Sequence, residues 1–417
     1  MGPSSTARLC LLLFLPLLAP ALASAQAHGR VLYALSPYPG CEDPVTGLIA
    51  DSHGILYGTA LAGGSSGDGC VFELSPSPTG WQQTVLHSFS GADGNGPYGA
   101  LTLDAAGNLY GTTDDGGTYN GGVVFELSPS ADGTWTESTL YSFGNGDDAR
   151  GSQCNLIFDD RGNLYGTAGG GPYSKGTVFR LSPSQDGWVE TILYSFSSGI
   201  NGPGGSLPKG GLVMDREGRL YGVTTDGGEY GSGTVFELAP AEDSGYTERI
   251  IHSFDGTDGS NPDSGLTMDK SGNLYATTDA GGNSSFCGAI TELTKNADGS
   301  WGENVLRQMN ATDGCSIVGP VAFDEAGNLY AAAQFGAING MGSIFMLTPT
   351  QSGPWTETML HRFDFKFPDG EDGRNPYAGV IMVTGKLFGT TSGGGINNVG
   401  IVFEITPPGP DSRSGAN

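Results

Sequence analysis

The sequence contains few basic residues. Lysine and arginine number 18 against 44 aspartates and glutamates, so the formal net charge is −26 in a chain of 417 residues. A surface of this sign repels the phosphate groups of DNA and RNA, and nucleic acid is therefore not expected as a partner. An acidic surface is typical of soluble exported proteins and is compatible with binding of divalent cations.

Long apolar segments are absent after the first 25 residues, and no later stretch shows the apolar period of a helix. We therefore expect no membrane span in the mature chain. At the N-terminus an apolar run follows Arg8, is broken by Pro16 and Pro20, and ends in small residues at 23–25. This pattern predicts a cleaved secretory signal peptide over residues 1–25, because a membrane anchor would be longer and unbroken. The mature protein is expected to be secreted, either extracellular or periplasmic.

Cysteine is also scarce. The chain has 6 cysteines, and none has the Cys-x-x-Cys spacing of common zinc sites. Cys10 belongs to the predicted signal peptide. The remaining cysteines are odd in number, so that one thiol is left unpaired or forms an intermolecular link. They are Cys41, Cys70, Cys154, Cys287 and Cys315.

Glycine is abundant instead, with 72 residues, and it recurs within a repeated motif. The stretch GNLYGTT at 107–113 has close copies along the chain. Aligning the copies on their aromatic residue gives Tyr57, Tyr110, Tyr165, Tyr221, Tyr275, Tyr330 and Phe388. The spacing is about 55 residues, a period that predicts a propeller or a solenoid.

Each repeat divides into four short predicted strands, called a to d. In the second repeat, strand b is the motif itself, strand c is VVFEL at 123–127, and strand d is WTESTLYSF at 135–143. Seven such units predict an all-β fold, a seven-bladed β-propeller of four-stranded antiparallel blades over residues 30–407.

The two ends of the repeat region predict how the ring closes. The last unit stops after its strand c, near residue 405, whereas VLYALS at 31–36 resembles a strand d that precedes the first unit. We therefore expect the N-terminal strand to complete the seventh blade and to cover its open edge. Residues 408–417 are polar and are expected to form a disordered tail.

The repeated motif is interpreted as a packing device. Asp104 is expected to accept backbone N–H groups in the turn between strands a and b, where Gly107 adopts positive φ. Leu109 and Tyr110 would point to opposite faces of the blade. The next glycine, Gly111, is expected to let adjacent blades approach closely.

The stretch GNLYGTTDDGGTYNGGVVFELSP at 107–129 and its copies resemble the GloVer tandem repeat of Gloeobacter and Verrucomicrobia. The resemblance covers all seven units, although Ala276 and Ala331 replace the motif glycine in copies five and six. It implies an exported protein, and the family has no established biochemical activity. Members often end in a surface-sorting signal, whereas no apolar segment follows Pro408, so the chain resembles a released member.

Candidate binding residues lie in the d–a and b–c loops, which open on one face of a propeller. The d–a loops carry Asp93, Asp258 and Asp313. They predict either a ring of carboxylates for a cation or sugar hydroxyls, or simple Asp-Gly turns. No cofactor is expected; calcium is the alternative that these carboxylates would suit, although no EF-hand pattern is present. The identity of any metal is left open.

Aromatic residues accompany these aspartates in the b–c loops. Tyr119, Tyr173 and Tyr230 are either platforms for carbohydrate or caps of the glycine-rich loops. Three histidines stand at the same strand-d position in three different blades: His87, His252 and His361. We expect them on the outer rim, too far apart to form one metal site.

The cysteines also fall in loops of this face. Cys41 and Cys70 lie in the d–a and b–c loops of the first blade, and Cys287 and Cys315 in loops of adjacent blades. We predict disulfides Cys41–Cys70 and Cys287–Cys315, which leave Cys154 free.

These features predict a binding module for an extracellular glycan or another surface component such as a protein, and not an enzyme. One alternative is a lactonase- or lyase-like propeller enzyme with a central metal, since the Asp-turn-Gly-Asn-Leu-Tyr pattern is loosely similar to such propellers. A second alternative is a structural or adhesive cell-surface module. The sequence does not indicate an oligomeric state.

Overall fold

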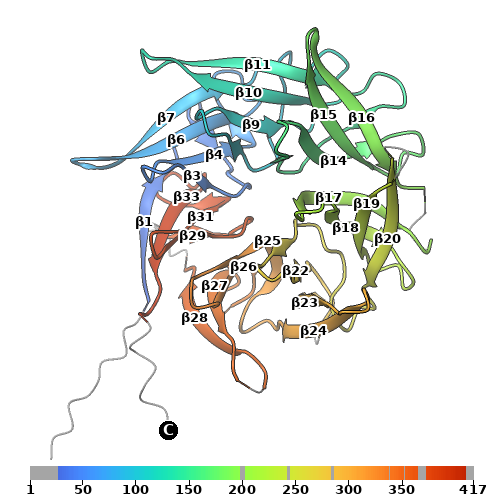
Figure 1. Ribbon diagram of the computed structural model, residues 1–417. Coiled ribbons are helices and arrows are strands. Elements are labelled where there is room, and N and C mark those ends of the chain that lie inside the picture. The colour runs from blue at the N-terminus through green and yellow to red at the C-terminus, as the bar shows by residue number, and fades with distance from the viewer. Residues whose placement is uncertain are drawn as a thin grey trace, which may run out of the picture. The chain divides into compact units, whose positions relative to one another are not determined.

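The computed structural model describes residues 27–197, 202–241, 245–282, 286–337, 339–351, 353–364 and 372–409. All regular secondary structure in these ranges is β-strand, and no helix there could span a membrane. The strands form seven four-stranded antiparallel sheets arranged in a ring (Figure 1). The predicted seven-bladed propeller is therefore confirmed. The predicted signal peptide and residues 410–417 lie outside the described ranges.

The first four blades follow the chain, each with its strands in the order a, b, c, d. Blade 1 contains β3 (Ile49–Ala50), β4 (Leu56–Ala60), β6 (Cys70–Ser77) and β7 (Gly80–Ser88). Blade 2 contains β8 (Thr102–Leu103), β9 (Leu109–Thr112), β10 (Val123–Pro129) and β11 (Trp135–Ser142). Blade 3 contains β13 (Ile157–Phe158), β14 (Leu164–Gly170), β15 (Thr177–Ser184) and β16 (Gly187–Ser195). Blade 4 contains β17 (Gly205–Met214), β18 (Leu220–Gly227), β19 (Thr234–Pro240) and β20 (Tyr246–Ser253).

The remaining blades continue the same order, and short strands extend some of them. Blade 5 contains β21 (Thr267–Met268), β22 (Leu274–Thr277), β23 (Ala289–Lys295) and β24 (Trp301–Gln308). Blade 6 contains β25 (Cys315–Phe323), β26 (Leu329–Phe335), β27 (Ser343–Thr348) and β28 (Thr356–Arg362). Blade 7 contains β30 (Ile381–Val383), β31 (Lys386–Thr391), β33 (Ile401–Thr406) and β1 (His28–Ala34). In three d–a loops a short strand pairs with the end of strand b or the residues after it: β2 (Cys41–Glu42) with β5 (Ala62–Gly63), β12 (Ala149–Arg150) with β14, and β29 (Gly373–Arg374) with β32 (Gly393–Gly394).

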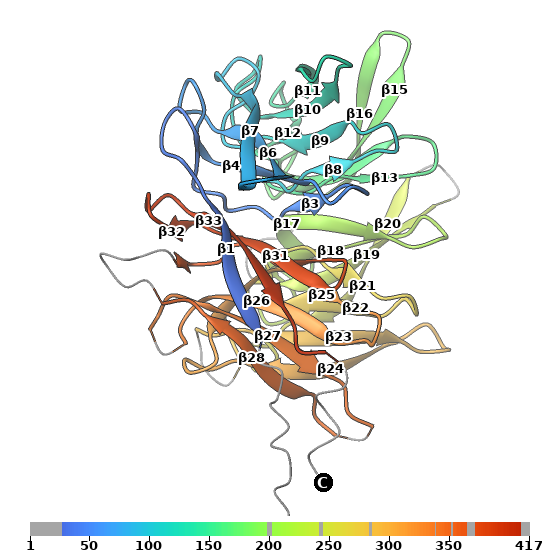
Figure 2. The same ribbon diagram turned by 90° about the vertical axis from the view of Figure 1, so that its left-hand side faces the viewer.

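The N-terminal strand closes the ring as predicted. β1 pairs antiparallel with β33, in a register that runs from His28 opposite Thr406 to Ala34 opposite Ile401. Figure 2 shows β1, in blue, beside the red strands of blade 7. Residues Ala27–Pro407 form one compact unit.

The hydrophobic core lies between neighbouring blades. Leu109 packs with Tyr57 of blade 1, whereas Tyr110 packs with Leu156 and Phe158 of blade 3. The rings of Tyr110 and Phe158 meet edge to face at 5.0 Å. The predicted alternation of the motif leucine and tyrosine is confirmed: each blade gives one face to each neighbour.

The motif aspartate organises the a–b turn. Asp104 Oδ1 accepts the N–H groups of Ala106 and Asn108 (2.8 and 2.9 Å), and Oδ2 accepts the side-chain amide of Asn108 and the hydroxyl of Tyr110. Gly107 has a φ of 91° in this turn. The motif residues therefore bond to one another, as expected of a structural turn.

The role predicted for the motif's second glycine is wrong. A Cβ at Gly111 would lie 2.6 Å from Cζ of Phe125, which is opposite it in strand c of the same blade. The glycine therefore makes room for a ring within its own blade and not for a neighbouring blade. In blade 5 the partner is the smaller Thr291, and Ala276 stands in the glycine position.

Candidate functional site

Seven equivalent residues surround the propeller axis where the d–a loops enter strand a. Each stands two positions after a residue with positive φ, which identifies them as equivalent. All seven line one pocket of about 400 Å³. They are Val45, Tyr98, Gln153, Lys209, Asp263, Val318 and Tyr377. Because every blade contributes a residue, this axial pocket lies at the centre of the ring.

Hydrogen bonds between blades hold the backbone at these entry points. Leu207 has a φ of 55°, which is rare for a large side chain, and its N–H donates to the carbonyl of Lys175 in the preceding b–c loop (2.8 Å). The corresponding bonds at the other entry points are Asp43–Val399, Gly96–Asp68, Gly151–Gly121, Asn261–Ser232, Ser316–Cys287 and Asn375–Met341. The surrounding loops thus hold the backbone at each entry point, and at Leu207 they impose a conformation that is strained for a large side chain.

The seven axial residues belong to five residue types, whereas the strands around them repeat. Tyr98 and Tyr377 interact through their hydroxyls. Gln153 contributes an amide, and Lys209 and Asp263 contribute opposite charges. An asymmetric set of donors and acceptors on a near-symmetric scaffold can fix one orientation of a bound molecule.

Burial changes the acidity of these groups. Burial and the nearby charge of Asp279 raise the pKa of Asp263 to about 6, and Lys209 opposes this rise. Burial, together with Tyr98, raises the pKa of Tyr377 to about 12, so its phenol keeps its proton at neutral pH. Among the described residues that line the pocket there is one carboxylate and no histidine. That donor set does not suit the central metal of a lactonase-like enzyme.

None of the predicted aspartates lines the axial pocket. Asp93 accepts the N–H and hydroxyl of Ser90 (2.8 and 2.9 Å) and contacts His87 Nε2 (3.0 Å). Asp258 accepts the N–H of Asp255 (2.9 Å) and contacts His252 Nε2 (2.7 Å). Each aspartate therefore organises its own loop and also reaches back to strand d of its own blade.

The third predicted aspartate does the same with a different partner. Asp313 bonds to the guanidinium of Arg307 and to the side chain of Asn310. In blade 2 the equivalent residue is Asp148, which accepts the hydroxyl of Tyr141 (3.2 Å). The segment between the strand-d residue and the loop aspartate is one residue longer in blade 2 than in the other clusters.

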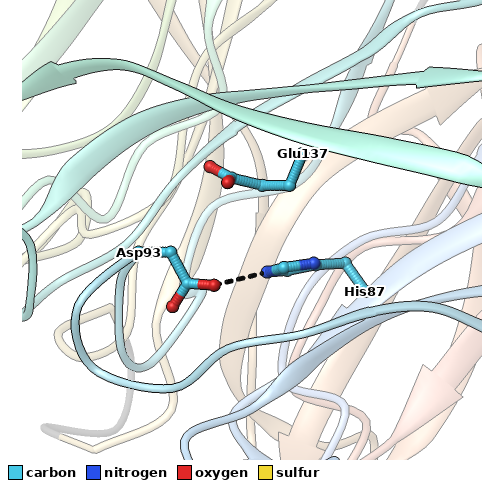
Figure 3. Close-up of side chains that lie close together, drawn as sticks. All are labelled: His87, Asp93 and Glu137. Atoms are coloured by element: carbon cyan, nitrogen blue, oxygen red, sulfur yellow. Dashed lines mark hydrogen bonds and ion pairs between the residues drawn. The ribbon is translucent and has the colours of Figure 1, made fainter.

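A glutamate from the next blade completes each of these contacts. We call the set an inter-blade cluster. It contains the loop aspartate, the seventh residue of strand d and the third residue of the following strand d, with positions counted from the Trp or Tyr that opens each strand d. Figure 3 shows the first cluster, in which the Glu137 carboxylate lies over the His87–Asp93 pair. The described clusters are His87–Asp93–Glu137, Tyr141–Asp148–Glu190, His252–Asp258–Glu303 and Arg307–Asp313–Glu357.

Each cluster places two carboxyl groups close together, and the clusters differ in what reduces the repulsion between them. In the tyrosine cluster, burial and the Asp148 charge raise the pKa of Glu190 to about 9, so that a proton separates the two carboxyl groups. In the arginine cluster the guanidinium contacts both carboxylates, with Nε 2.7 Å from Glu357. His361 contacts Asp372 (3.2 Å), but the third position, in β1, is Gly29.

The predicted tyrosines are exposed on the b–c loops. The exposed fractions of Tyr119, Tyr173 and Tyr230 are 48%, 60% and 58%. None lines the axial pocket. Tyr230 and Asp258 do lie together, in a second pocket of about 380 Å³ beside the His252 cluster.

Both predicted cysteine pairs are joined in the structure, Cys41 to Cys70 and Cys287 to Cys315. Cys154 is free and buried, and burial raises the pKa of its thiol. The sequence interpretation missed the axial residues and the cluster glutamates. A proline precedes five of the axial residues, and alignment on it would have revealed the former: Pro44, Pro97, Pro208, Pro262 and Pro376.

Comparison with known proteins supports the repeat assignment. The model of the Gloeobacter/Verrucomicrobia repeat family matches residues 21–236 and 208–414. No curated protein matches the chain.

The chain resembles solved structures only distantly. One, from Bacteroides uniformis, is assigned as a 6-phosphogluconolactonase (15% identity, 78% of this chain and 87% of that chain, TM-score 0.49). Another is the periplasmic gluconolactonase of Pseudomonas aeruginosa (16% identity, 76% and 84%, TM-score 0.49). A third is a luciferin-regenerating enzyme (14% identity, 92% and 96%, TM-score 0.45). No activity is inferred from likeness at this level.

Proposed function

The chain belongs to the Gloeobacter/Verrucomicrobia repeat family, and we propose that it is an exported protein that binds part of an extracellular carbohydrate in its axial pocket. One observation carries this proposal. The strand motif is nearly the same in every blade, but the seven residues that meet at the axis differ in size, polarity and charge. A purely structural ring would need no such difference.

The chemistry of the pocket suits sugar hydroxyls. Gln153 and Asn155 offer both donors and acceptors, and Asp263 offers an acceptor. Tyr98 and Tyr377 present an aromatic body with a hydroxyl, which can pack against a sugar ring and also bond to it. The volume of about 400 Å³ lies in the range of small-molecule sites.

Two further features support an exported protein. The two disulfides suit an oxidising compartment, either extracellular or periplasmic. The formal net charge of −26 suits a soluble protein outside the cell. The N-terminal signal pattern agrees with both.

The proposal can be tested with a panel of soluble mono- and oligosaccharides. Thermal unfolding of the purified protein would identify sugars that raise the midpoint, because a ligand that binds only the folded state stabilises it. Calorimetry would then compare the native protein with Tyr98→Ser and with Gln153→Ala. We expect both substitutions to weaken binding at least about tenfold, the loss of one or two hydrogen bonds.

Tyr173→Ser is the matched control, because Tyr173 is exposed on the same face but lies outside the axial pocket. We expect it to bind like the native protein. Loss of binding in this variant alone would place the site on the b–c loops. Absence of binding to every sugar in the panel would favour a structural or adhesive role.

A further inference from the structure

We infer that the clusters His87–Asp93–Glu137 and His252–Asp258–Glu303 are two separate binding sites for a divalent transition-metal ion of the zinc class. In each cluster one nitrogen of the imidazole and one oxygen of each carboxylate lie within 4.8 Å of one another. Three such ligands with an open fourth position are a common zinc arrangement. The imidazole favours zinc over calcium or magnesium, which prefer sites made of oxygen alone.

The ligands come from different elements, so the geometry is set by the fold. His252 lies in β20 and Asp258 in the loop that follows it, whereas Glu303 lies in β24 of the next blade. The contact joins the outer strands of two neighbouring blades. A bound ion would therefore link neighbouring blades.

In the arginine cluster a positively charged side chain occupies the space between the two carboxylates. There Arg307 places its guanidinium against both Asp313 and Glu357. The histidine clusters have the same two carboxylates in the same places. An imidazole is shorter and has fewer donors than a guanidinium. A divalent ion would neutralise both carboxylates at the position that the arginine side chain fills.

The His252 cluster is partly shielded and has an entry route. The exposed fractions of its side chains are 11% for His252, 8% for Asp258 and 37% for Glu303. The cluster opens into the pocket of about 380 Å³, which Glu229 and Asp255 also line. These additional carboxylates would attract a cation to the site.

A third histidine provides an internal control. His361 contacts Asp372 as the other histidines contact their aspartates, but Gly29 occupies the position of the glutamate. Among the residues that the structure describes, no third ligand lies beside this pair. We therefore expect two bound ions per chain, not three.

The test is titration of the purified full chain with Co²⁺ alone, followed by absorption spectroscopy, and then displacement with Zn²⁺ in a calorimeter. We expect two Co²⁺ ions per chain, with the strong visible absorption of four-coordinate cobalt. Glu137→Gln and Glu303→Gln should each remove one ion, and the double variant should remove both. His361→Gln should still bind two.

His252→Arg with His87→Arg supplies a second variant that keeps the clusters charged and should remain folded, as the arginine cluster does. It should bind no Co²⁺. The inference is overturned if the native chain binds no Co²⁺, if its stoichiometry is unchanged in the double glutamate variant, or if only six-coordinate cobalt is seen. In those cases the clusters act only as polar contacts between blades.

Discussion

Arg30 and Glu404, which are 374 positions apart, form a two-point ion pair that joins the first and last strands of the propeller. Nε and Nη2 of Arg30 donate to the two carboxylate oxygens of Glu404 at 3.2 and 3.0 Å. Lys386 also donates to Glu404 (3.0 Å). The Glu404 side chain is only 8% exposed, so these partners replace the water it has lost.

Glu404→Gln should weaken the closure of the ring. Burial alone would raise the pKa of Glu404, but hydrogen bonds from Arg30 and Lys386 hold it below its usual value. The carboxylate therefore stabilises the fold above its unfolded pKa, and the effect is lost as pH falls through the lower folded value. We expect a loss of about 1 kcal/mol in the free energy of unfolding at neutral pH, since Arg30 is largely exposed.

Denaturant unfolding as a function of pH measures this effect. The difference between the variant and the native protein should shrink below a pH of about 4. Glu325→Gln, at an exposed position, serves as the control. A difference that stays constant with pH would show that Glu404 acts through packing and not through charge.

Gly111→Ala should destabilise blade 2, because the new Cβ would overlap the ring of Phe125. We expect a cost of about 1–3 kcal/mol in unfolding free energy, as for other overpacked cores. The cost should fall when Phe125→Leu is also present, so the two changes should not be additive. Full additivity in denaturant unfolding would contradict the role assigned to the glycine.

Reduction should destabilise the face that carries the d–a and b–c loops. Each disulfide spans fewer than 30 residues (separations of 29 and 28), which corresponds to about 3.5 kcal/mol of stabilisation by loop closure. Peptide mapping without reductant should recover Cys41 linked to Cys70 and Cys287 linked to Cys315. Cys154 should react with iodoacetamide only after unfolding, since it is buried and its thiol pKa is raised. Labelling of Cys154 in the folded protein would contradict the structure.

The tyrosine cluster should make stability fall as pH rises from about 4.5 to about 9. Burial and Asp148 raise the pKa of Glu190 to about 9, far above its value in an unfolded chain. The folded state therefore keeps a proton that the unfolded state loses, and stability decreases as pH rises from about 4.5 towards 9. Glu190→Gln cannot ionise, so its unfolding midpoint should fall less between pH 6 and 9. Parallel pH curves for the native protein and the variant would contradict this assignment.

Ligand binding in the axial pocket should depend on the ionisation of Asp263. Its pKa of about 6 means that the carboxylate is charged at neutral pH and becomes protonated in mildly acidic solution. If it accepts hydrogen bonds from sugar hydroxyls, affinity should fall as pH drops through about 6. Calorimetry on the native protein and on Asp263→Asn should show a pH-dependent affinity in the first and a weaker, flat response in the second. A flat response in both would remove Asp263 from the binding site.

The fold could be predicted from the sequence because each repeat shows the order and spacing of its own strands. The positions of Tyr110 and its equivalents fixed the number of blades, and the strand d that precedes the first repeat predicted the pairing of β1 with β33. The cysteine pairs followed from the loops to which they belong. Each of these inferences needed only the order of strands in one blade.

The site was harder to predict because it depends on contacts between blades. Asp93 was recognised as a loop residue, but its neighbour Glu137 belongs to another repeat and looks like any exposed strand residue. The role of Gly111 failed for a related reason: the sequence does not show that the ring of Phe125 lies over it. The axial residues give no repeated signal in the sequence, because their identities vary among the blades.

The antiparallel register of the closing strands also determines how the ring would respond to tension. His28 is opposite Thr406, so the chain enters and leaves the propeller at the same end of this two-stranded contact. A force that pulls these two ends apart would load the hydrogen bonds one at a time, starting at that pair, and would not shear them together. The two closing strands would therefore separate progressively under load. The chain links the other blades in series, and these would bear load only after the closing strands have separated.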